Sequence, residues 1–194
     1  MYRLFKYFRP RKGFKNLPNE GRMLHLGCGS NLLEGWANID FAGSSEIIVH
    51  DLTRSLPLGS GTVDFIFTEH FVEHISRQQG QALFEECYRL LASGGVLRIS
   101  TPSLKKLIDE YASGRVDEWA DVDWNPETPC QMLNEGVRLW GHQFIYDFDE
   151  ISQALSGAGF VRIKPVDWRE STHRELSGLE CRPFHNDLIV EAEK

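Results

Sequence analysis

The feature that most constrains this fold is an alternation of short apolar runs with helical or turn-rich connections. Short apolar runs bounded by turn residues are typical of buried strands. We expect strands at residues 23–26, 36–40, 46–50, 63–67, 96–100, 160–166 and 187–193. This alternation predicts a Rossmann-like α/β fold, with a mostly parallel sheet, helices on both faces and an antiparallel final strand.

Three helices are predicted from capping residues and apolar spacing. Ser76 and Gln79 have the spacing of a capping box, Ser103 precedes a second helix, and Asp147 with Glu150 begins a third. Glycines close two of them, Gly94 or Gly95 after the first and Gly159 after the third. The inward positions are Leu83, Phe84, Cys87, Leu90 and Leu91, then Leu104, Leu107, Ile108 and Tyr111, and finally Ile151, Ala154, Leu155 and Ala158. Residues 112–146 read as an irregular stretch holding Trp119, Trp124 and Trp140, of which we expect Trp140 in the core.

Composition limits the classes of partner and compartment. The length of 194 residues suits a single domain. We expect it at residues 21–194, preceded by a basic, aromatic appendage at 1–20. Residues 1–22 carry seven basic side chains and one acidic one, whereas the net charge is −7, so the body is acidic and a nucleic-acid partner is not expected. No apolar run suits a membrane span or a signal peptide, and the four cysteines form no close pair. We therefore expect a cytoplasmic protein.

A glycine turn follows the first expected strand. Gly27, Cys28 and Gly29 let the backbone turn sharply and approach a ligand closely. In a parallel sheet, ligands bind beyond the carboxyl ends of the strands, which is where this turn lies. A dinucleotide fingerprint needs a third glycine three residues after the second, and Leu32 stands there instead. Leu32 therefore makes a nicotinamide or flavin cofactor less favoured, and the turn alone could also be a plain structural turn.

Acidic residues follow three further strands. Asp40 ends the second strand, where a carboxylate can accept hydrogen bonds from ribose hydroxyls. Asp51 and Leu52 follow the third strand, placed to receive an adenine ring, and Glu69 and His70 follow the fourth. Each also has a structural alternative, as a helix cap, a turn residue or a packed side chain.

Several segments together resemble the class I S-adenosylmethionine-dependent methyltransferases, in particular a methyltransferase-11-like group associated with surface-glycan biosynthesis. They are LHLGCGSN (24–31), LEGWANID (33–40), HDL (50–52), EHFVEH (69–74), YRLLASGGVLR (88–98), LNEG (133–136), GHQFIYD (141–147) and ELSGLE (175–180). The resemblance covers residues 21–194 and is specific only in combination.

The resemblance implies S-adenosylmethionine as cofactor and a sugar or other glycan-linked hydroxyl as acceptor. By position, Gly27, Cys28 and Gly29 would lie against the methionine part and Asp40 would hold the ribose. Asp51 and Leu52 would frame the adenine, and Glu69 would lie near the amino-acid end or the transferring methyl. The chain departs from the common pattern at His25, often acidic in the class, and at Asn31, often glycine. About a dozen residues separate Gly29 from Asp40, so the first helix should be short or absent.

A hydroxyl acceptor needs a general base, for which His142 is the first candidate and His70 the second. His142 stands among aromatic residues in the stretch expected to cover the acceptor, where Asp147 could orient it or simply cap a helix. No group of residues has compelling metal-ligand spacing, so no metal is expected. Two other classes stay open, a non-catalytic cofactor-binding module of a glycan-assembly complex and a nicotinamide oxidoreductase.

The basic N-terminus suggests a further partner. Aromatic and basic side chains interleave through residues 1–15, a composition that suits the headgroup region of an anionic membrane. Peripheral docking at the inner membrane surface would suit an enzyme with a lipid-linked acceptor. The alternative is that this segment packs on its own acidic domain.

Overall fold

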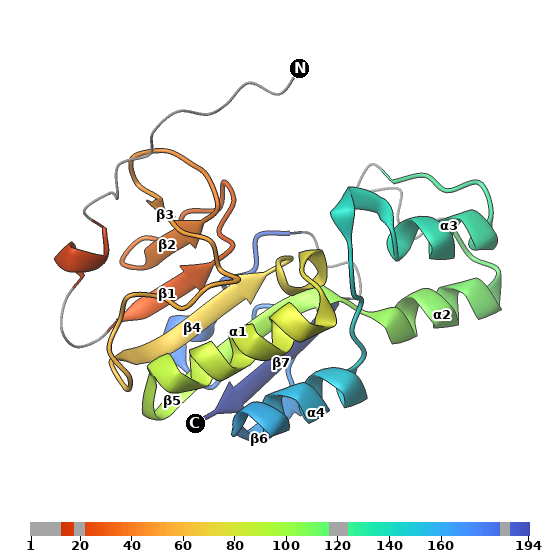
Figure 1. The fold of residues 1–194 in the computed structure, drawn as a ribbon. Helices are drawn as coiled ribbons and strands as arrows, with labels where there is room; N and C mark the ends of the chain where they lie inside the picture. The colour runs from red at the N-terminus through yellow and green to blue at the C-terminus, as the bar shows by residue number, and fades with distance from the viewer. Residues whose placement is uncertain (1–12, 18–21, 117–123, 183–186) are drawn as a thin grey trace.

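The structure is a computed structural model that describes residues 13–17, 22–116, 124–182 and 187–194 (Figure 1). Its strands are β1 (Met23–Leu26), β2 (Ala37–Asp40), β3 (Ile48–Val49), β4 (Val63–Glu69), β5 (Leu91–Pro102), β6 (Val161–Pro165) and β7 (Asp187–Glu193). Its α-helices are α1 (Arg77–Leu90), α2 (Leu104–Ser113), α3 (Pro129–Gly136) and α4 (Phe148–Ala158). Short 3-10 helices are η1 (Phe14–Asn16), η2 (Val72–His74), η4 (Leu139–Gly141) and η5 (Arg174–Leu176).

The strands form one seven-stranded sheet in the order β3-β2-β1-β4-β5-β7-β6. Strands β1 to β5 pair in parallel, and β7 runs antiparallel to both of its neighbours, β5 and β6. The predicted α/β class, with a mostly parallel sheet and an antiparallel final strand, is therefore confirmed. Strand β1 lies between β2 and β4, so the chain winds outward in both directions from this point, and the carboxyl ends of β1 and β4 flank the crevice.

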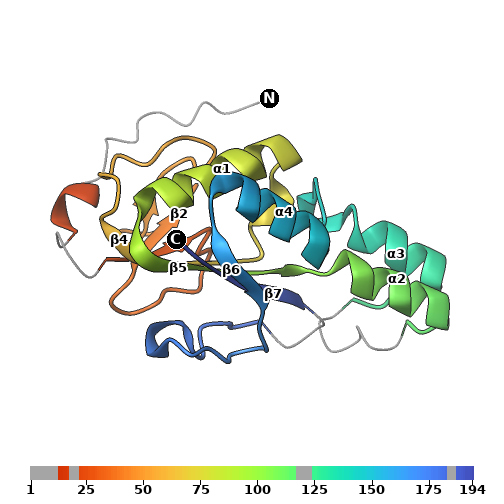
Figure 2. The same ribbon diagram turned by 90° about the horizontal axis from the view of Figure 1, so that it is seen from below.

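Helices α1 and α4 cover one face of the sheet (Figures 1 and 2). Helix α1 begins with the predicted capping box, in which Ser76 and Gln79 each bond the backbone of the other. Its buried apolar residues pack on the sheet side together with Ile151 and Leu155 of α4. Helix α4 ends at Gly159, whose φ of 109° suits a residue without a β-carbon. Apolar spacing alone thus located this layer.

The second face carries no α-helix among the described residues, which differs from the expected helices on both faces. The segment after β6, at residues 166–182 and including η5, covers it instead (Figure 2). The strand residues under this segment include buried polar groups beside Phe65, which packs against His173. Arg98 of β5 is fully buried and pairs with Glu180 at 2.5 Å and with Glu191 at 2.7 Å. Polar groups are not part of a helix-type apolar stripe, so hydrophobic spacing gave no signal for this covering.

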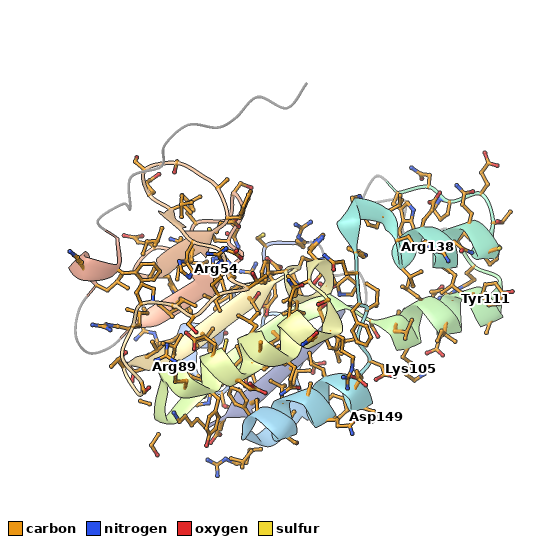
Figure 3. The ribbon with its side chains drawn as sticks, viewed as in Figure 1. Arg54, Arg89, Lys105, Tyr111, Arg138 and Asp149 are labelled. Atoms are coloured by element: carbon orange, nitrogen blue, oxygen red, sulfur yellow. The ribbon has the colours of Figure 1, made fainter. Side chains whose placement is uncertain are left out.

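Helices α2 and α3 form a small layer that extends beyond the sheet (Figure 1). Helix α3 lies inside the stretch predicted to be irregular, so that prediction was wrong. Leu107, Trp124 and Met132 form its core. Because this core is narrow, two positions predicted to face inward, Ile108 and Tyr111, are each 48% exposed, and Figure 3 shows Tyr111 at the outer end of α2.

Two tryptophans of that stretch have opposite surroundings. Trp124 is 8% exposed, whereas Trp140, predicted to lie in the core, is 58% exposed. Trp140 adopts a φ of 56° in η4, and this left-handed turn directs its ring edge to Trp124 at a centroid distance of 5.4 Å without burying it. Trp119 falls outside the described residues.

The described part of the N-terminal segment lies against the domain. Phe14 and Leu17 pack on the main core, and the Phe14 ring meets the His50 ring edge-on at 5.5 Å. Residues 1–12, which hold most of the basic and aromatic side chains, fall outside the described residues. Within the described chain, no helix combines the length and hydrophobicity needed to span a bilayer.

Candidate cofactor and acceptor site

A cavity of about 580 Å³ opens at the carboxyl ends of β1, β2 and β4. This is the edge at which parallel sheets bind ligands. Of the residues proposed from the sequence, the lining includes Gly27, Cys28, Gly29, Asp40, Glu69 and His70. It also includes residues that the sequence reasoning did not assign to the site: His25, Ser30, Asn31, Phe71, His74, Cys181 and Arg182.

The glycine turn forms one side of the cavity, and its two glycines have different surroundings. Gly27 has a φ of 68°, and a β-carbon there would lie 2.6 Å from the Phe71 side chain. Gly29 has a φ of 51°, and a β-carbon there would meet nothing within 4 Å. Gly27 therefore permits close packing inside the protein, whereas Gly29 leaves open space on the cavity side. No helix follows before β2, as the short spacing predicted.

Asp40 joins the end of β2 to this turn. Parallel pairing of β1 with β2 brings the two strand ends together, and the Gly29 amide donates to Asp40 Oδ2 at 2.8 Å. The Ala42 amide lies 3.5 Å from Oδ1. A carboxylate accepts about four hydrogen bonds, so Asp40 keeps acceptor capacity toward the cavity.

The floor of the cavity is polar but uncharged at His25. Burial lowers the pKa of His25 to about 4, although the hydrogen bond with Asn38 opposes that shift, so the ring is neutral at pH 7. The Nδ2 atom of Asn31 is buried and has no hydrogen-bond partner among the described residues. A buried donor of this kind favours a ligand that brings an acceptor.

Asp51 and Leu52 do not line the cavity. Leu52 is 5% exposed and belongs to the main core. The Asp51 carboxylate accepts hydrogen bonds from the Thr53 amide and hydroxyl, which lower the pKa of Asp51, and it also pairs with Arg54. The structure thus gives both residues local structural partners, and an adenine contact stays a prediction.

Glu69 ties the C-terminal segment to the end of β4. Its carboxylate accepts from the Cys181 amide at 3.1 Å and from the Arg182 amide at 3.2 Å, and the Cys181 Sγ lies 3.1 Å away. Burial, followed by the neighbouring Glu69, raises the pKa of Cys181 to about 11, so its thiol stays protonated. These contacts span more than a hundred residues of sequence, and no local motif marked Cys181 or Arg182 as cavity residues.

His70 lies between two carboxylates. Its Nε2 lies 2.7 Å from Asp187 and its Nδ1 lies 3.3 Å from Glu73. Burial lowers the pKa of His70, but the hydrogen bonds and charges of Asp187 and Glu73 outweigh it and raise the pKa to about 9. An imidazolium with both N–H groups engaged has no free lone pair, so this geometry argues against His70 as the general base.

His142 does not line the cavity, but it contacts His74, which does. Its Nδ1 is 2.9 Å from the Gly136 carbonyl, so Nδ1–H donates and Nε2 carries the lone pair. Burial lowers the pKa of His142, which keeps the ring neutral at pH 7. The His142 ring contacts His74, which lines the cavity, at a centroid distance of 5.0 Å. Asp147 caps α4 through the Glu150 amide, which is the second of its two predicted roles.

Solved structures with this arrangement of strands decide what the fold is. A methyltransferase from Archaeoglobus fulgidus that depends on S-adenosylmethionine is 17% identical, with a TM-score of 0.55 over 90% of this chain and 86% of that one. One from Mesorhizobium loti is 19% identical, with a TM-score of 0.54 over 92% and 94%. The chain has the fold of S-adenosylmethionine-dependent methyltransferases.

A second comparison agrees with this methyltransferase fold. Residues 30–99, from the glycine turn into β5, match a family described as a methyltransferase domain. A possible histamine N-methyltransferase from Thermotoga maritima is 15% identical, with a TM-score of 0.54 over 95% of this chain and 87% of that one. No curated protein sequence matches the chain.

Proposed function

We propose that this protein binds S-adenosylmethionine in the cavity and transfers its methyl group to a hydroxyl acceptor. The single observation that carries the proposal is the Gly29–Asp40 contact beside the β1–β4 crevice. It puts a carboxylate with spare acceptor capacity next to a turn with open space above it. A ribose diol requires acceptors of this kind.

Two further features support the fit of this cofactor. Asn31 Nδ2 offers a buried, unpartnered donor at the turn, judged over the described residues. Arg182 and Glu69 also line the cavity and carry charges complementary to a carboxylate and an ammonium group. We propose that Gly27, Cys28 and Gly29 contact the methionine part, that Asp40 holds the ribose and that Glu69 lies at the amino-acid end.

The protein's own residues must then align an acceptor and take its proton. S-adenosylmethionine supplies a methyl group already activated by its sulfonium. Near-ideal alignment of two reactants in a site can lower the barrier by about 7 kcal/mol. A positioned base contributes about 10²–10⁴-fold. We propose His142 for that role, because Nδ1–H donates to the Gly136 carbonyl, so Nε2 carries the lone pair, and because burial lowers the pKa of the ring.

The acceptor class remains a proposal from the sequence resemblance, namely a hydroxyl of a sugar or of a glycan-linked precursor. Incubating the protein with S-adenosylmethionine carrying a labelled methyl group and with a panel of sugars and lipid-linked glycans tests it. Transfer of label to a hydroxyl supports the proposal. Cofactor binding with no transfer to any acceptor would favour the non-catalytic module, and retention of NAD in place of S-adenosylmethionine would favour the oxidoreductase.

We propose a peripheral membrane contact for residues 1–15 as a separate point. The core contact of Phe14 favours the alternative, packing on the domain, for the last part of this segment. Co-sedimentation with anionic vesicles distinguishes the two. Docking requires binding that weakens with salt and is lost on deletion of residues 1–12, whereas packing predicts no binding and a less stable truncated protein.

A further inference from the structure

Three potential metal ligands converge beside the cavity, on two segments distant in sequence. Glu73 and His74 belong to η2, and His142 follows η4. One ligand atom from each of the three lies within 4.8 Å of the others. His74 also lines the cavity, so this cluster and the proposed cofactor site share a wall.

Glu73 supplies a buried carboxylate oxygen to the cluster. Its side chain is fully buried, and Oε2 accepts from the Thr101 hydroxyl at 3.0 Å. Oε1 is buried, forms an ion pair with His70 Nδ1 at 3.3 Å and lies 3.9 Å from His74 Nε2. A carboxylate oxygen has two lone pairs, so Oε1 keeps one for a cation at this point.

His142 is oriented as a metal ligand. Metal-bound histidines usually donate their other ring N–H to a backbone carbonyl or a carboxylate, which fixes the tautomer and turns the lone pair to the metal. His142 Nδ1 has this partner in the Gly136 carbonyl at 2.9 Å. Thr101 holds Glu73 in the same manner. Both outer contacts therefore exist without the ion.

We propose that Glu73, His74 and His142 form a binding site for a divalent transition-metal ion of the zinc class. Two imidazoles and one carboxylate suit Zn²⁺ or Fe²⁺ better than Mg²⁺ or Ca²⁺, which prefer oxygen ligands. Three protein ligands leave a coordination position open for water or a substrate oxygen. Ligand atoms around tetrahedral zinc lie roughly 3.4 Å apart, so a small rotation of the partly exposed His74 completes the site.

His70 borders the site without blocking it. Its imidazolium lies 3.3 Å from the same Glu73 oxygen, and Asp187 holds its other nitrogen. The two negative charges of Glu73 and Asp187 exceed the single positive charge of His70. The local net charge therefore still favours a divalent cation. When the ion is bound, His142 Nε2 is a ligand and no longer a base, and acidifying the acceptor hydroxyl becomes the role of the ion.

Zinc binding can be measured without an acceptor or S-adenosylmethionine, so it fails or succeeds independently of the proposed methyl transfer. The full-length, tag-free protein is treated with a chelator, dialysed and titrated with Zn²⁺ in competition with a chromophoric chelator. We expect one ion per chain, with affinity lowered about 10–100-fold in Thr101→Val, which removes an outer contact only, and lowered further in His142→Ala, which removes a ligand. His173→Ala is the matched control, because His173 packs on Phe65 away from the cluster.

Folding of each variant is checked by its thermal melting curve before the titration. Co²⁺ provides a second readout, since a four-coordinate site gives intense visible absorption that should be lost in His142→Ala. Equal zinc affinity in wild type, His142→Ala and Thr101→Val would overturn the proposal, as would the absence of a stoichiometric site in the folded wild-type protein.

Discussion

The two sides of the cavity are built in different ways. The glycine wall, residues 27–31 with Asp40, consists mostly of backbone and is set by the parallel register of β1 and β2. The histidine wall consists of His70, Phe71 and His74, which line the cavity, with Glu73 and His142 against them. Its side chains are held by partners far away in sequence, such as Asp187 and Thr101. The first wall offers shape and one carboxylate, and the second offers titratable groups and lone pairs. We infer that cofactor binding depends on the first and acceptor chemistry on the second.

Replacing His142 gives the largest effect expected if this division holds. His142→Ala should reduce turnover by about 10²-fold or more, because it removes the base or metal ligand, and leave affinity for S-adenosylmethionine nearly unchanged. The measurement is methyl transfer to an acceptor found in the panel, beside cofactor titration by calorimetry. A parallel loss of cofactor affinity would mean that the two walls do not act separately.

A chelator then sharpens the role of His142. If the ion takes part, wild-type turnover falls on chelation and returns with Zn²⁺, whereas His142→Ala responds to neither. If His142 acts as a base alone, chelation leaves wild-type turnover unchanged. His173→Ala, on the other face of the sheet, should behave as wild type in each condition.

A matched pair of glycine variants tests the glycine wall. Gly27→Ala should lower the free energy of unfolding by about 1–2 kcal/mol for the left-handed backbone and by about 1–3 kcal/mol more for the clash with Phe71. Gly29→Ala carries only the backbone cost, because its β-carbon meets open space. Chemical denaturation measures both. Equal destabilisation would contradict the packing described for Gly27, and unchanged cofactor affinity in folded Gly29→Ala would show that the open space is not used.

The histidine wall should instead make stability depend on pH. His70 has its pKa raised from 6.5 to about 9, so its contribution is fully present below pH 6.5 and is lost as the pH rises through 9. The difference in free energy of unfolding between wild type and His70→Gln should therefore shrink by about 3 kcal/mol over that interval. Urea denaturation at pH 6, 7.5 and 9.5 measures it. A difference that does not change with pH would show that His70 is not charged in the folded protein.

The glycine wall could be predicted from the sequence, whereas most of the remaining site could not. Gly27, Gly29 and Asp40 stand at strand ends that apolar runs identified, so their meeting follows from the parallel sheet. The Glu69 carboxylate binds the Cys181 and Arg182 amides at the cavity, a tertiary contact with no local signal. The proposed metal site had no sequence signal, because the spacing of Glu73 and His74 gives no third ligand until the chain returns at His142.

The fold itself shows the same limit. The helix-covered face was predicted from apolar spacing and caps, as at Ser76 and Asp147. The polar face was not, because Arg98 and its carboxylate partners are buried as a network and not as an apolar stripe. Apolar spacing also did not predict α3. This helix packs against Leu107 in a small core separate from that of the main sheet.

The most direct test of the central claim is cofactor affinity in Asp40→Ala. The substitution removes charge-assisted hydrogen bonds worth about 1.5–3 kcal/mol, so calorimetry with S-adenosylmethionine should show affinity lowered about 10–150-fold. Asp109→Ala is the control, since the exposed Asp109 pairs with Lys105 on α2 and does not line the cavity, and it should bind as wild type. Wild-type affinity in a folded Asp40→Ala protein would contradict the claim that the glycine wall binds the ribose of the cofactor.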